Sequence, residues 1–405
     1  MRPDFLKDVR IADLTWAGAG PFGTKIFSDF GADVITIESS VRLDSVRTGG
    51  PFKDRKYGVN RSGYFASRNT GKKSVVVDLK SDKGRALVFD IIRQADVVSN
   101  NFGPGAMDRL GLSYDAVKAI KPDVIYLSMP MYGESGPRAE TLGVGMTISA
   151  VTALMWSTAY EAGDPVGPGT HYPDHAANPY HAAFAVMAAL RRRRLTGEGM
   201  KIDLSQVEST INFIGTAFVQ QALTGKEPPQ SSNVSPTMAP HGIYPCAGDD
   251  EWCAVTVATD EDWQRFCVAI GRPELGRDAS LASAAARVTN RAAVDGHVSE
   301  WTRGRPADEA ARLLREAGIP AARVASSQHL IERDEQLAAR GYWQRVEHPE
   351  LGRSLYASPP YRVDGERVEL SRPPLLGEHT KEVLSGLLGL DDATIGALEA
   401  EGVFK

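Results

Sequence analysis

The sequence predicts an α/β fold in which a doubly wound, mostly parallel, Rossmann-like sheet forms a large domain, joined to a smaller α+β domain. Two observations support this fold. Apolar runs rich in Val and Ile alternate with amphipathic segments over residues 9–128, and that alternation is typical of a parallel sheet with helices on both faces. A proline-rich segment at 224–240 then separates this region from a second strand and helix pattern. The length of 405 residues allows each domain a core of its own.

The expected strands of the large domain are short β-branched and apolar runs bounded by polar or turn residues. Helical spacing of apolar residues between them predicts the intervening helices. Because parallel sheets bind ligands at the carboxyl ends of their strands, we expect functional residues just after the strands. The strands are expected at 9–14, 34–38, 74–79, 96–99 and 124–128, and the helices at 21–30, 82–94 and 113–120.

Two further helices are expected before the proline-rich segment. Asn178 and Pro179 have the pattern of an N-cap and a first-turn proline, and apolar spacing continues to Gly197. Four arginines in the last turn complement the helix dipole. The uncharged stretch at 142–160 is long enough to span a bilayer, but Gly, Ser and Thr dilute it, which favours a buried helix.

The second domain is expected to combine a strand at 252–258 with helices at 261–270, 291–302 and 307–317. A short strand at 322–325 closes it, and helices at 328–339 and 381–388 follow. The predicted organisation is a large domain over 1–223, a linker over 224–240, a small domain over 241–326, a return linker over 327–360 and the last part of the large domain over 361–405.

Composition excludes several classes of function. The net charge of −5 gives no general attraction to nucleic acid or to anionic lipid. The three cysteines have no CxxC spacing, so they indicate neither a disulfide framework nor a cysteine zinc site. Charged residues interrupt the first ten positions, where a signal peptide would be apolar. We therefore expect a cytoplasmic protein without a nucleic-acid or membrane partner.

A GxGxxG pattern runs from Gly18 to Gly23, after the first strand, and Glu38 ends the second strand. This context is typical of NAD(P) or flavin binding, and hence of an oxidoreductase. Against that function, Pro21 removes a backbone N–H inside the motif, and Glu38 comes earlier than the usual spacing. Another nucleotide-bearing ligand, or a tight turn that only packs the helix, fits the pattern as well.

Titratable residues cluster at 171–175, just before the helix that starts near Asn178. Pro173 disfavours the helical turn that would bring His171 and His175 together on a metal, so no metal site is expected. Asp174 is either a capping residue or a reactive carboxylate held near a helix N-terminus. The cations Lys72, Lys73, Lys80 and Arg109 are either solvated or, clustered at one sheet edge, able to meet ligand phosphates.

Taken together, these segments resemble the family III CoA-transferases, which include formyl-CoA, carnitine and benzylsuccinate CoA-transferases and are related to the 2-methylacyl-CoA racemases. The resemblance covers nearly the whole chain and depends on many motifs in order. They are VRIADLT, AGP, FGADVITIE, RNTGKKSVVVDLK, NFGPGAMDRLGL, KPDVIYLS, YGESGP, YPDH, HAAFAVMAALRRRRLTGEGMKIDLSQ, RVTNR, AGIPAARV, HPELG and GEHTKEVL.

The resemblance implies roles for particular residues. Asp174 falls on the nucleophilic aspartate of the family. The implied contacts with CoA are Ala17, Val77, Lys80, Asn101, Phe102 and Arg109, and the acyl pocket is implied to include Trp16, Gly18, Gly133 and His175.

The sequence also departs from the family. Gly18 replaces a glutamine of the formyl-CoA enzymes, Ser39 replaces an arginine, and Gly145 lies near a common acidic position. The residues at 235–245 replace the family's glycine-rich lid. These departures argue against formate and oxalate and favour a bulkier acid.

The implied activity is transfer of CoA from an acyl-CoA to a free carboxylic acid through a covalent aspartyl intermediate, with acyl-CoA as a substrate and no permanently bound cofactor. Backbone N–H groups after Asp174 and near Gly133 to Gly136 are the expected oxyanion donors. The resemblance also implies an interlocked homodimer, or assembly with a related subunit. Two alternatives within the family stay open: racemase-like α-proton exchange, although YPDH replaces the racemases' GHD motif, and an inactive CoA-binding subunit.

Overall fold

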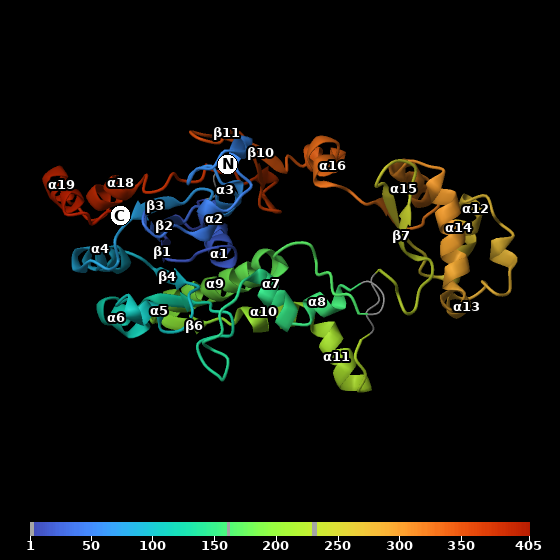
Figure 1. Ribbon diagram of the computed structural model, residues 1–405, viewed down its shortest axis with the longest axis horizontal. Coiled ribbons are helices and arrows are strands. Elements are labelled where there is room, and N and C mark those ends of the chain that lie inside the picture. The colour runs from blue at the N-terminus through green and yellow to red at the C-terminus, as the bar shows by residue number, and fades with distance from the viewer. Residues whose placement is uncertain (1–3, 160–162, 229–232) are drawn as a thin grey trace. The chain divides into compact units, whose positions relative to one another are not determined.

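The computed structural model describes residues 4–159, 163–228 and 233–405, and these residues form two compact units (Figure 1). The first unit comprises Met1–Trp156, Val166–Pro228 and Gln336–Lys405, and the second comprises Ser157–Pro165 and Pro229–Glu335. Each unit is built around its own apolar core. The first unit therefore contains both ends of the chain.

A six-stranded sheet runs through the first unit in the order β3-β2-β1-β4-β5-β6, and every neighbouring pair is parallel. This confirms the predicted fold class. The strand order reverses between β1 and β4, and the carboxyl ends at such a switch point form the usual ligand crevice. The strands are β1 Arg10–Asp13, β2 Asp33–Glu38, β3 Lys73–Val76, β4 Val97–Asn100, β5 Ile125–Ser128 and β6 Met200–Asp203.

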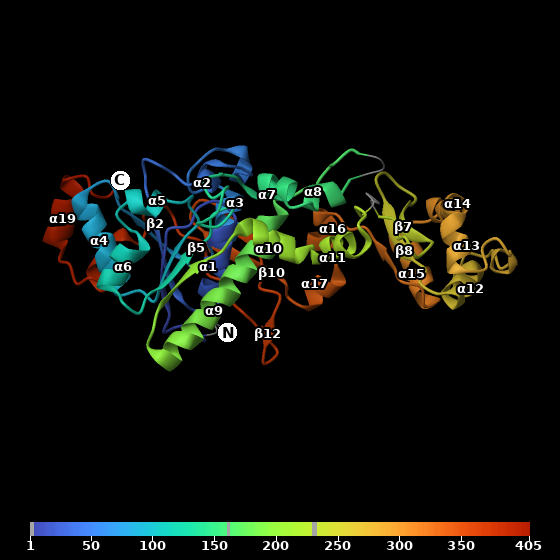
Figure 2. The ribbon, with the colours of Figure 1, turned by 90° about the horizontal axis from the view of Figure 1, so that it is seen from below.

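Helices cover both faces of this sheet (Figure 2). Successive residues of β1 point to opposite faces of the sheet. Ile11 packs in the core with α1 and α9, and Ala12 packs in the core of the opposite face. The helices of the first face are α1 Ala19–Asp29 and α9 Asn178–Thr196. Those of the second face are α4 Asp82–Arg93, α5 Ala106–Arg109, α6 Tyr114–Ile120 and α18 Thr380–Gly386.

Serine caps set where two of these helices begin. The hydroxyl of Ser81 accepts the N–H of Gly84 at the start of α4, and the hydroxyl of Ser113 accepts the N–H of Ala116 at the start of α6. Each cap satisfies a backbone donor that the first turn would leave unpaired. The starts of both helices therefore agree with the sequence prediction to within one residue.

The expected single buried helix over 142–160 is wrong. The segment forms α7, Gly145–Val151, and α8, Leu154–Ser157, which are interrupted at Ala153, where φ is 63°. Met146 is 61% exposed, so the segment does not lie wholly in the core. Its last residue lies outside the described part of the chain. Between residues 4 and 405, wherever the structure describes the chain, no helix is long and apolar enough to cross a bilayer.

The expected helix over 328–339 is likewise two helices, α16 Ser327–Glu332 and α17 Glu335–Ala339. The chain leaves the helical conformation at Arg333, where φ is −129°. Apolar spacing alone does not reveal such a break, because both pieces keep a helical periodicity.

The C-terminal part of the chain returns to the outer edge of the sheet at β3. The N–H of Ser74 donates to Nδ1 of His379, and the N–H of Val76 donates to the hydroxyl of Thr380. The N–H of Asp78 donates to the carbonyl of Val403. This part consists of the hairpins β10 Trp343–His348 with β11 Gly352–Ala357 and β12 Arg362–Val363 with β13 Glu366–Arg367, followed by α18 and α19 Asp392–Ala400.

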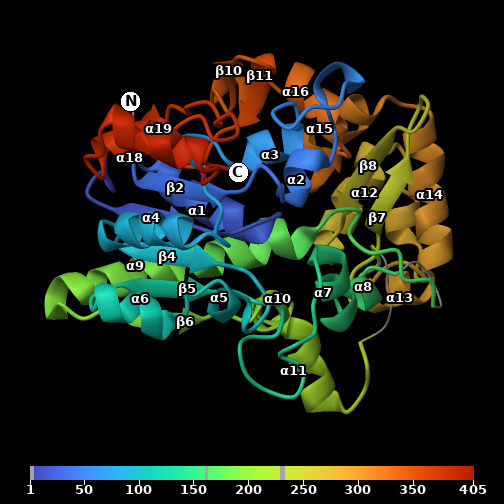
Figure 3. The same cartoon turned by 60° about the vertical axis from the view of Figure 1, so that its left-hand side comes forward.

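The second unit is a small α+β domain with an antiparallel sheet in the order β7-β8-β9 (Figure 3). Trp263 and Phe266 stack in its core beside the buried thiols of Cys253 and Cys267. Residues 229–232 of the expected linker lie outside the described residues. The elements are β7 His241–Pro245, β8 Trp252–Thr256, β9 Ala321–Arg323, α12 Asp260–Ala269, α13 Ala284–Thr289, α14 Arg291–Arg303 and α15 Ala307–Glu316.

Two arginines of the RVTNR motif hold the segment that precedes β7. Arg287 is fully buried and donates to the carbonyl of Ala239, while Arg291 donates to the carbonyls of Ser235 and Met238. The segment at 235–239 is therefore fixed by side-chain to backbone hydrogen bonds within its own unit.

Candidate active site

Asp174 lies in a single π-helical turn, Pro173–Ala177, that leads directly into α9. The predicted N-cap at Asn178 is wrong, because the chain is already helical before it. Asn178 is fully buried and donates from its side-chain amide to Gln206. Pro173 fits because the first position of a helical turn needs no backbone N–H. Such π turns are frequent at functional sites, and this one leaves Asp174 only 8% exposed.

The carboxyl group of Asp174 is packed against the backbone of two glycines. A Cβ atom on Gly18 would lie 2.9 Å from Asp174 Cβ, and one on Gly145 would lie 2.7 Å from Asp174 Oδ2. Both distances are shorter than real Cβ contacts, so both positions require glycine unless something moves. The N–H of Gly145 donates a hydrogen bond to the carboxylate. Two of the residues at which the sequence departs from the family it resembles, Gly18 and Gly145, therefore lie against Asp174.

Burial raises the pKa of Asp174 to about 6, against smaller opposing effects of His171, the Gly145 N–H and Arg68. Burial, followed by the charge of Arg68, lowers the pKa of the neighbouring His175 to about 4. At neutral pH the site holds an ionised carboxylate beside a neutral imidazole. A carboxylate that has lost most of its water is a better nucleophile than a solvated one.

We expect kcat/KM for an acyl-CoA donor to fall as the pH drops through about 6, with a limiting slope of one log unit per pH unit. The reason is that only the ionised carboxylate can attack a carbonyl carbon. His175 is neutral throughout this range, because its pKa is about 4. His175→Gln should therefore keep the inflection. A profile that is flat between about pH 5 and 8, or an inflection lost in His175→Gln, would contradict this assignment.

Tyr64 on α3, Gly63–Arg68, orients the imidazole beside Asp174. Its hydroxyl lies 3.2 Å from His175 Nε2, and the hydroxyl of Thr170 lies 3.3 Å from His175 Nδ1. The Tyr64 hydroxyl is also 2.9 Å from the position of a Cβ atom on Gly18, which places it beside Asp174. Burial raises the pKa of Tyr64, so the phenol stays protonated and able to donate.

The turn after β1 meets the loop after β4 at the switch point of the sheet. The N–H of Trp16 donates to Asn101 Oδ1 over 2.8 Å, and Asn101 Nδ2 donates back to the Trp16 carbonyl over 2.7 Å. The Trp16 ring meets Phe102 edge-on, with centroids 5.6 Å apart. Ala17 has a φ of 63°, and its N–H donates to the carboxylate of Asp44. The structure thus brings together the expected CoA-site residues that follow β1 and β4.

The other expected CoA contacts, Lys80, Arg109 and Val77, differ in how far their side chains are exposed to solvent. Lys80 and Arg109 are exposed, and Arg109 Nη1 lies 3.1 Å from the position of a Cβ atom on Gly105, in the loop after β4. Val77 is only 1% exposed in the apolar core, so its side chain offers no surface to a ligand. Arg42, which sequence analysis did not single out, lies 5.4 Å from the centroid of the Trp16 ring.

Lys72 and Lys73 form ion pairs with carboxylates of the protein. They therefore do not form the phosphate-binding cluster at the sheet edge that was one of the two expectations from the sequence. Lys72 is buried and donates to Asp13 over 3.0 Å. Lys73 lies 3.2 Å from both Asp33 and Glu382. The Lys72 pair links β3 to the end of β1, and so supports the turn that carries Trp16 and Ala17.

In the turn at Gly133, one of the expected oxyanion donors is already occupied. The N–H of Glu134 donates to the carboxylate of Asp203, at 3.1 Å from each oxygen, and is therefore occupied. A Cβ atom on Gly133 would meet this same carboxylate rather than Asp174. The backbone donor that reaches Asp174 comes from Gly145 instead.

The GxGxxG turn serves packing rather than recognition of a ribose. A Cβ atom on Gly20 would lie 2.4 Å from Thr15 Cβ, so this glycine allows the start of α1 to approach the preceding turn. Glu38 accepts two hydrogen bonds from the buried guanidinium of Arg47 and one from Ser74. The acidic residue on which the dinucleotide interpretation depended is therefore already paired.

Three of the arginines at the end of α9 form ion pairs with carboxylates of the same unit. Arg192 pairs with Glu198, Arg193 with Asp96 and Arg194 with Asp8. Within residues 4–159, 163–228 and 233–405, no group of three or more His, Cys, Asp or Glu side chains could hold a metal ion.

Sequence reasoning missed Tyr64, Arg68 and Asp44, all of which lie between β2 and β3. They have no motif spacing of their own, and their neighbours in space are Ala17 in the turn after β1, Phe22 in α1 and His175 in the π turn. One signal was available: more than thirty residues of irregular pattern separate the two strands, and connections longer than about 15 residues are usually functional or disordered.

Comparison with known proteins identifies the class. A model described as CoA-transferase family III matches residues 6–380, so the chain belongs to this family. The formyl-CoA:oxalate CoA-transferase of Streptomyces coelicolor is 32% identical over 98% of both chains. The succinyl-CoA:glutarate CoA-transferase of Homo sapiens is 30% identical over 98% of this chain and 89% of its own. A CAIB/BAIF family protein from Brucella suis superposes with a TM-score of 0.85 at 29% identity, over 94% of this chain and 98% of that one. The protein is therefore a CoA-transferase, as the motifs predict.

Proposed function

We propose that this CoA-transferase moves CoA from an acyl-CoA thioester to a free carboxylic acid through a covalent intermediate on Asp174. The observation that carries the proposal is the buried carboxyl group of Asp174, packed against Gly18, which follows the switch-point turn. A desolvated carboxylate with a raised pKa beside a ligand crevice is typical of a reacting group.

The chemistry begins when the Asp174 carboxylate attacks the thioester carbonyl. The C–S bond breaks, which gives a mixed anhydride and the CoA thiolate. The thiolate then attacks the aspartyl carbonyl to form an aspartyl-CoA thioester, and the donor acid leaves as its carboxylate. The acceptor carboxylate attacks this thioester, and the thiolate released attacks the new anhydride at its acyl carbon. The product is a new acyl-CoA, Asp174 is regenerated, and one thioester has replaced another.

The groups around Asp174 suit the charges that develop in these steps. Each tetrahedral intermediate carries a negative oxygen, which backbone N–H groups and hydroxyls stabilise when they are already in position. The N–H of Gly145 donates to the carboxyl group, and the protonated Tyr64 hydroxyl lies next to it. We assign these two donors to the oxyanion at the aspartyl carbonyl.

We place CoA in the crevice of Trp16, Asn101 and Phe102, with Lys80 and Arg109 meeting its phosphates. We expect Lys80→Ala and Arg109→Ala each to raise the KM for the CoA thioester about tenfold with little change in kcat, because a phosphate contact is the same in the ground and transition states. Arg345→Ala, which removes an exposed arginine from β10, serves as the control. Unchanged KM values, or an equal rise in the control, would contradict this placement.

The acids are inferred from relatives and from the site. The relatives above are named for oxalate and glutarate, which are both dicarboxylic acids. The glycines do not themselves enlarge the pocket, since Asp174 and Tyr64 lie close to the Cβ position of Gly18. We therefore expect the acid to be chosen by polar groups near Asp174 rather than by the space that Gly18 and Gly145 leave.

We further propose that the protein works as a homodimer or together with a related subunit. The support is a set of large apolar side chains exposed on α9, α10 (Gln206–Phe213) and α11 (Gly215–Thr224) of the first unit. Exposed apolar groups that recur on adjoining helices mark association surfaces. Those side chains are Phe184, Met187, Leu195, Phe213, Phe218, Val219 and Leu223.

Trapping of the intermediate tests the proposed reaction. The protein is incubated with a panel of acyl-CoAs, including succinyl-CoA, in the presence of hydroxylamine, and its peptides are mapped. A hydroxamate confined to Asp174, and absent from Asp174→Asn, is the expected result and identifies the donor. Absence of label with every donor, despite CoA binding, would refute the covalent mechanism. Deuterium uptake into the acyl group would then distinguish α-proton exchange from an inactive CoA-binding subunit.

A further inference from the structure

Arg68, the last residue of α3, is a half-buried cation held between aromatic rings. Its guanidinium carbon lies 4.5 Å from the centroid of Phe22 and 5.7 Å from that of Tyr64. Its Nε is buried without a hydrogen-bond partner. In the described residues no carboxylate forms an ion pair with it. The aromatic faces partly stabilise the charge, but they leave its N–H groups without an anionic acceptor.

The buried cations of the first unit are arranged differently from the half-buried Arg68. A buried charge without a partner is costly, and proteins therefore pair such groups. The buried cations with carboxylate partners are Lys25 with Asp29, Arg47 with Glu38 and Lys72 with Asp13. An arginine left unpaired among them is suited to an anion that arrives from solution.

Arg68 lies close to the nucleophile without pairing with it. Phe22, against which it stacks, is four residues after Gly18 in α1, and Tyr64 reaches the Cβ position of Gly18 with its hydroxyl. The charges of Arg68 and Asp174 act on one another. The two side chains form no hydrogen bond or ion pair within the described residues, so Asp174 does not neutralise the Arg68 guanidinium by direct contact.

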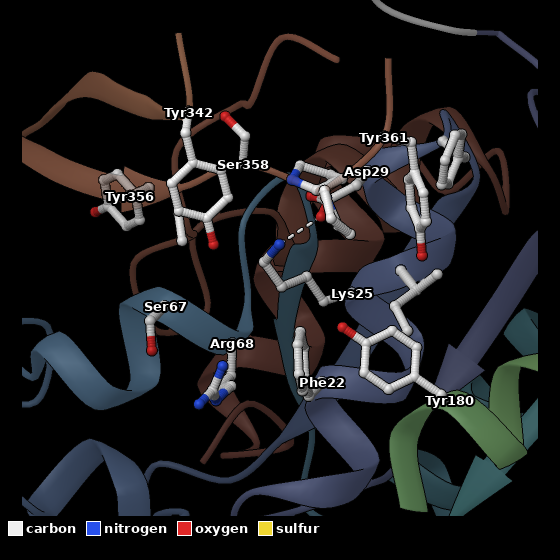
Figure 4. Close-up of a pocket in the computed structure, with 15 residues that line it drawn as sticks. Phe22, Lys25, Asp29, Ser67, Arg68, Tyr180, Tyr342, Tyr356, Ser358 and Tyr361 are labelled. Carbon is white, nitrogen blue, oxygen red and sulfur yellow. Dashed lines mark hydrogen bonds and ion pairs between the residues drawn. The ribbon is translucent and has the colours of Figure 1, made fainter. Parts of the chain in front are cut away.

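Arg68 also lines a cavity of about 270 Å³ beside α1. Figure 4 shows Arg68 next to Phe22 at the edge of this cavity, with Tyr180 and Tyr342 on its walls. The ion pair of Lys25 and Asp29 on another wall is internally neutral, so Arg68 contributes the net positive charge of the lining. Tyrosine hydroxyls and an arginine fork together suit a carboxylate.

We propose that Arg68 binds the second carboxylate of a dicarboxylic acid substrate whose first carboxylate reacts at Asp174. The proposal rests on the function proposed above and names the feature by which that site would choose its acid. An acid with a second carboxylate satisfies the guanidinium with charge-assisted hydrogen bonds, while a monocarboxylic acid of equal length leaves it unpaired. Sites that bind a polar group in this way reject analogues that lack it.

The test compares acids of equal length on the same variant. Succinate, glutarate and adipate are each paired with butyrate, pentanoate and hexanoate as acceptors, with the donor that labels Asp174. The wild type should prefer at least one dicarboxylic acid, and Arg68→Met should reduce that preference about a hundredfold. Arg68→Lys, which keeps the charge but loses the fork, should retain part of it. Arg345→Met, on the exposed face of β10, should change nothing.

Several results would overturn the proposal. One is a wild type without preference for any dicarboxylic acid, and another is an Arg68→Met variant that keeps the preference. A third is a variant that loses activity equally with both acids of each pair, since loss of the stacking on Phe22 would do that. Because the readout is a ratio measured within one variant, partial destabilisation does not imitate the expected result.

Equilibrium binding separates this proposal from the proposed function. The affinity of the six acids is measured by calorimetry in the presence of CoA, for the wild type and for both Arg68 variants, without turnover. Weaker binding of dicarboxylic acids alone in Arg68→Met supports the role of Arg68 even if no hydroxamate forms. Equal affinity in wild type and Arg68→Met refutes it even if Asp174 is labelled.

Discussion

Replacement of Asp174 by asparagine should lower kcat/KM by at least about a thousandfold, equivalent to about 4 kcal/mol of activation free energy. The amide is nearly isosteric with the carboxyl group, so it fits between Gly18 and Gly145 and can still accept the Gly145 N–H. It cannot form an anhydride with the acyl group, because its oxygen is a weak nucleophile. Initial rates with the donor identified by trapping measure the loss.

The same variant should be more stable than the wild type at neutral pH. The pKa of Asp174 is raised from 3.8 to about 6 by burial, so folding favours the protonated form. The contribution of Asp174 to stability is therefore present below pH 3.8 and is lost as the pH rises through about 6. An amide avoids that loss, which is about 2 to 3 kcal/mol for a shift of about two pKa units.

Denaturant unfolding of both proteins at pH 7.5 and at pH 4 provides the measurement. The stability difference should be large at pH 7.5 and should shrink at pH 4, where both side chains are neutral in the folded state. A variant that is inactive and also less stable at pH 7.5 would show that Asp174 supports the fold rather than the reaction. Residual activity within tenfold of the wild type would exclude Asp174 as the nucleophile.

Replacement of Gly145 by alanine should reduce kcat/KM by about a hundredfold or more. The new Cβ atom would lie 2.7 Å from Asp174 Oδ2 and 2.8 Å from His171 Cβ, so the carboxyl group must rotate or α7 must shift. Either movement lengthens the hydrogen bond from the Gly145 N–H to the carboxylate. Displacement of a reacting group by about 1 Å is enough for an effect of this size.

Gly296→Ala is the matched control for this substitution. Gly296 is an exposed residue inside α14, and a Cβ atom there would have no neighbour within 4 Å. We expect the control to keep full activity and to be slightly stabilised, because alanine has the higher helix propensity. Equal activity of Gly145→Ala and Gly296→Ala would show that the close approach of Gly145 to Asp174 is irrelevant to the reaction.

The parallel sheet was predictable because each central strand includes a short run rich in apolar and β-branched residues. In β1, β2, β4 and β5 nearly every residue is buried, as expected for strands covered on both faces. The edge strand β6 was missed, because Met200–Asp203 alternates between half-buried and exposed residues and keeps no such signal. The break at Ala153 was missed because hydropathy does not reveal a positive φ.

Asp174 was recognised from motif resemblance, and its chemical setting came from the structure. In the sequence, Gly18 and Gly145 are far from Asp174, and their approach depends on how α1, α7 and the π turn pack. No signal in the sequence pointed to Arg68, for a similar reason. Its significance lies in the absence of an ion-pair partner among the described residues, and this absence is seen only in the three-dimensional structure.

The return of the chain's end to β3 fixes the order in which the protein can be completed during translation. The N–H groups of Ser74 and Val76 cannot form these hydrogen bonds until their acceptors, which lie 305 and 304 residues later in the chain, have been synthesised. At ribosomal rates of about 5 to 20 residues per second, that interval is roughly 15 to 60 s. Throughout it the nascent sheet has an open edge, of the kind at which chains pair wrongly with one another. The unit that carries Asp174 is therefore finished only after His379 and Thr380 have been synthesised.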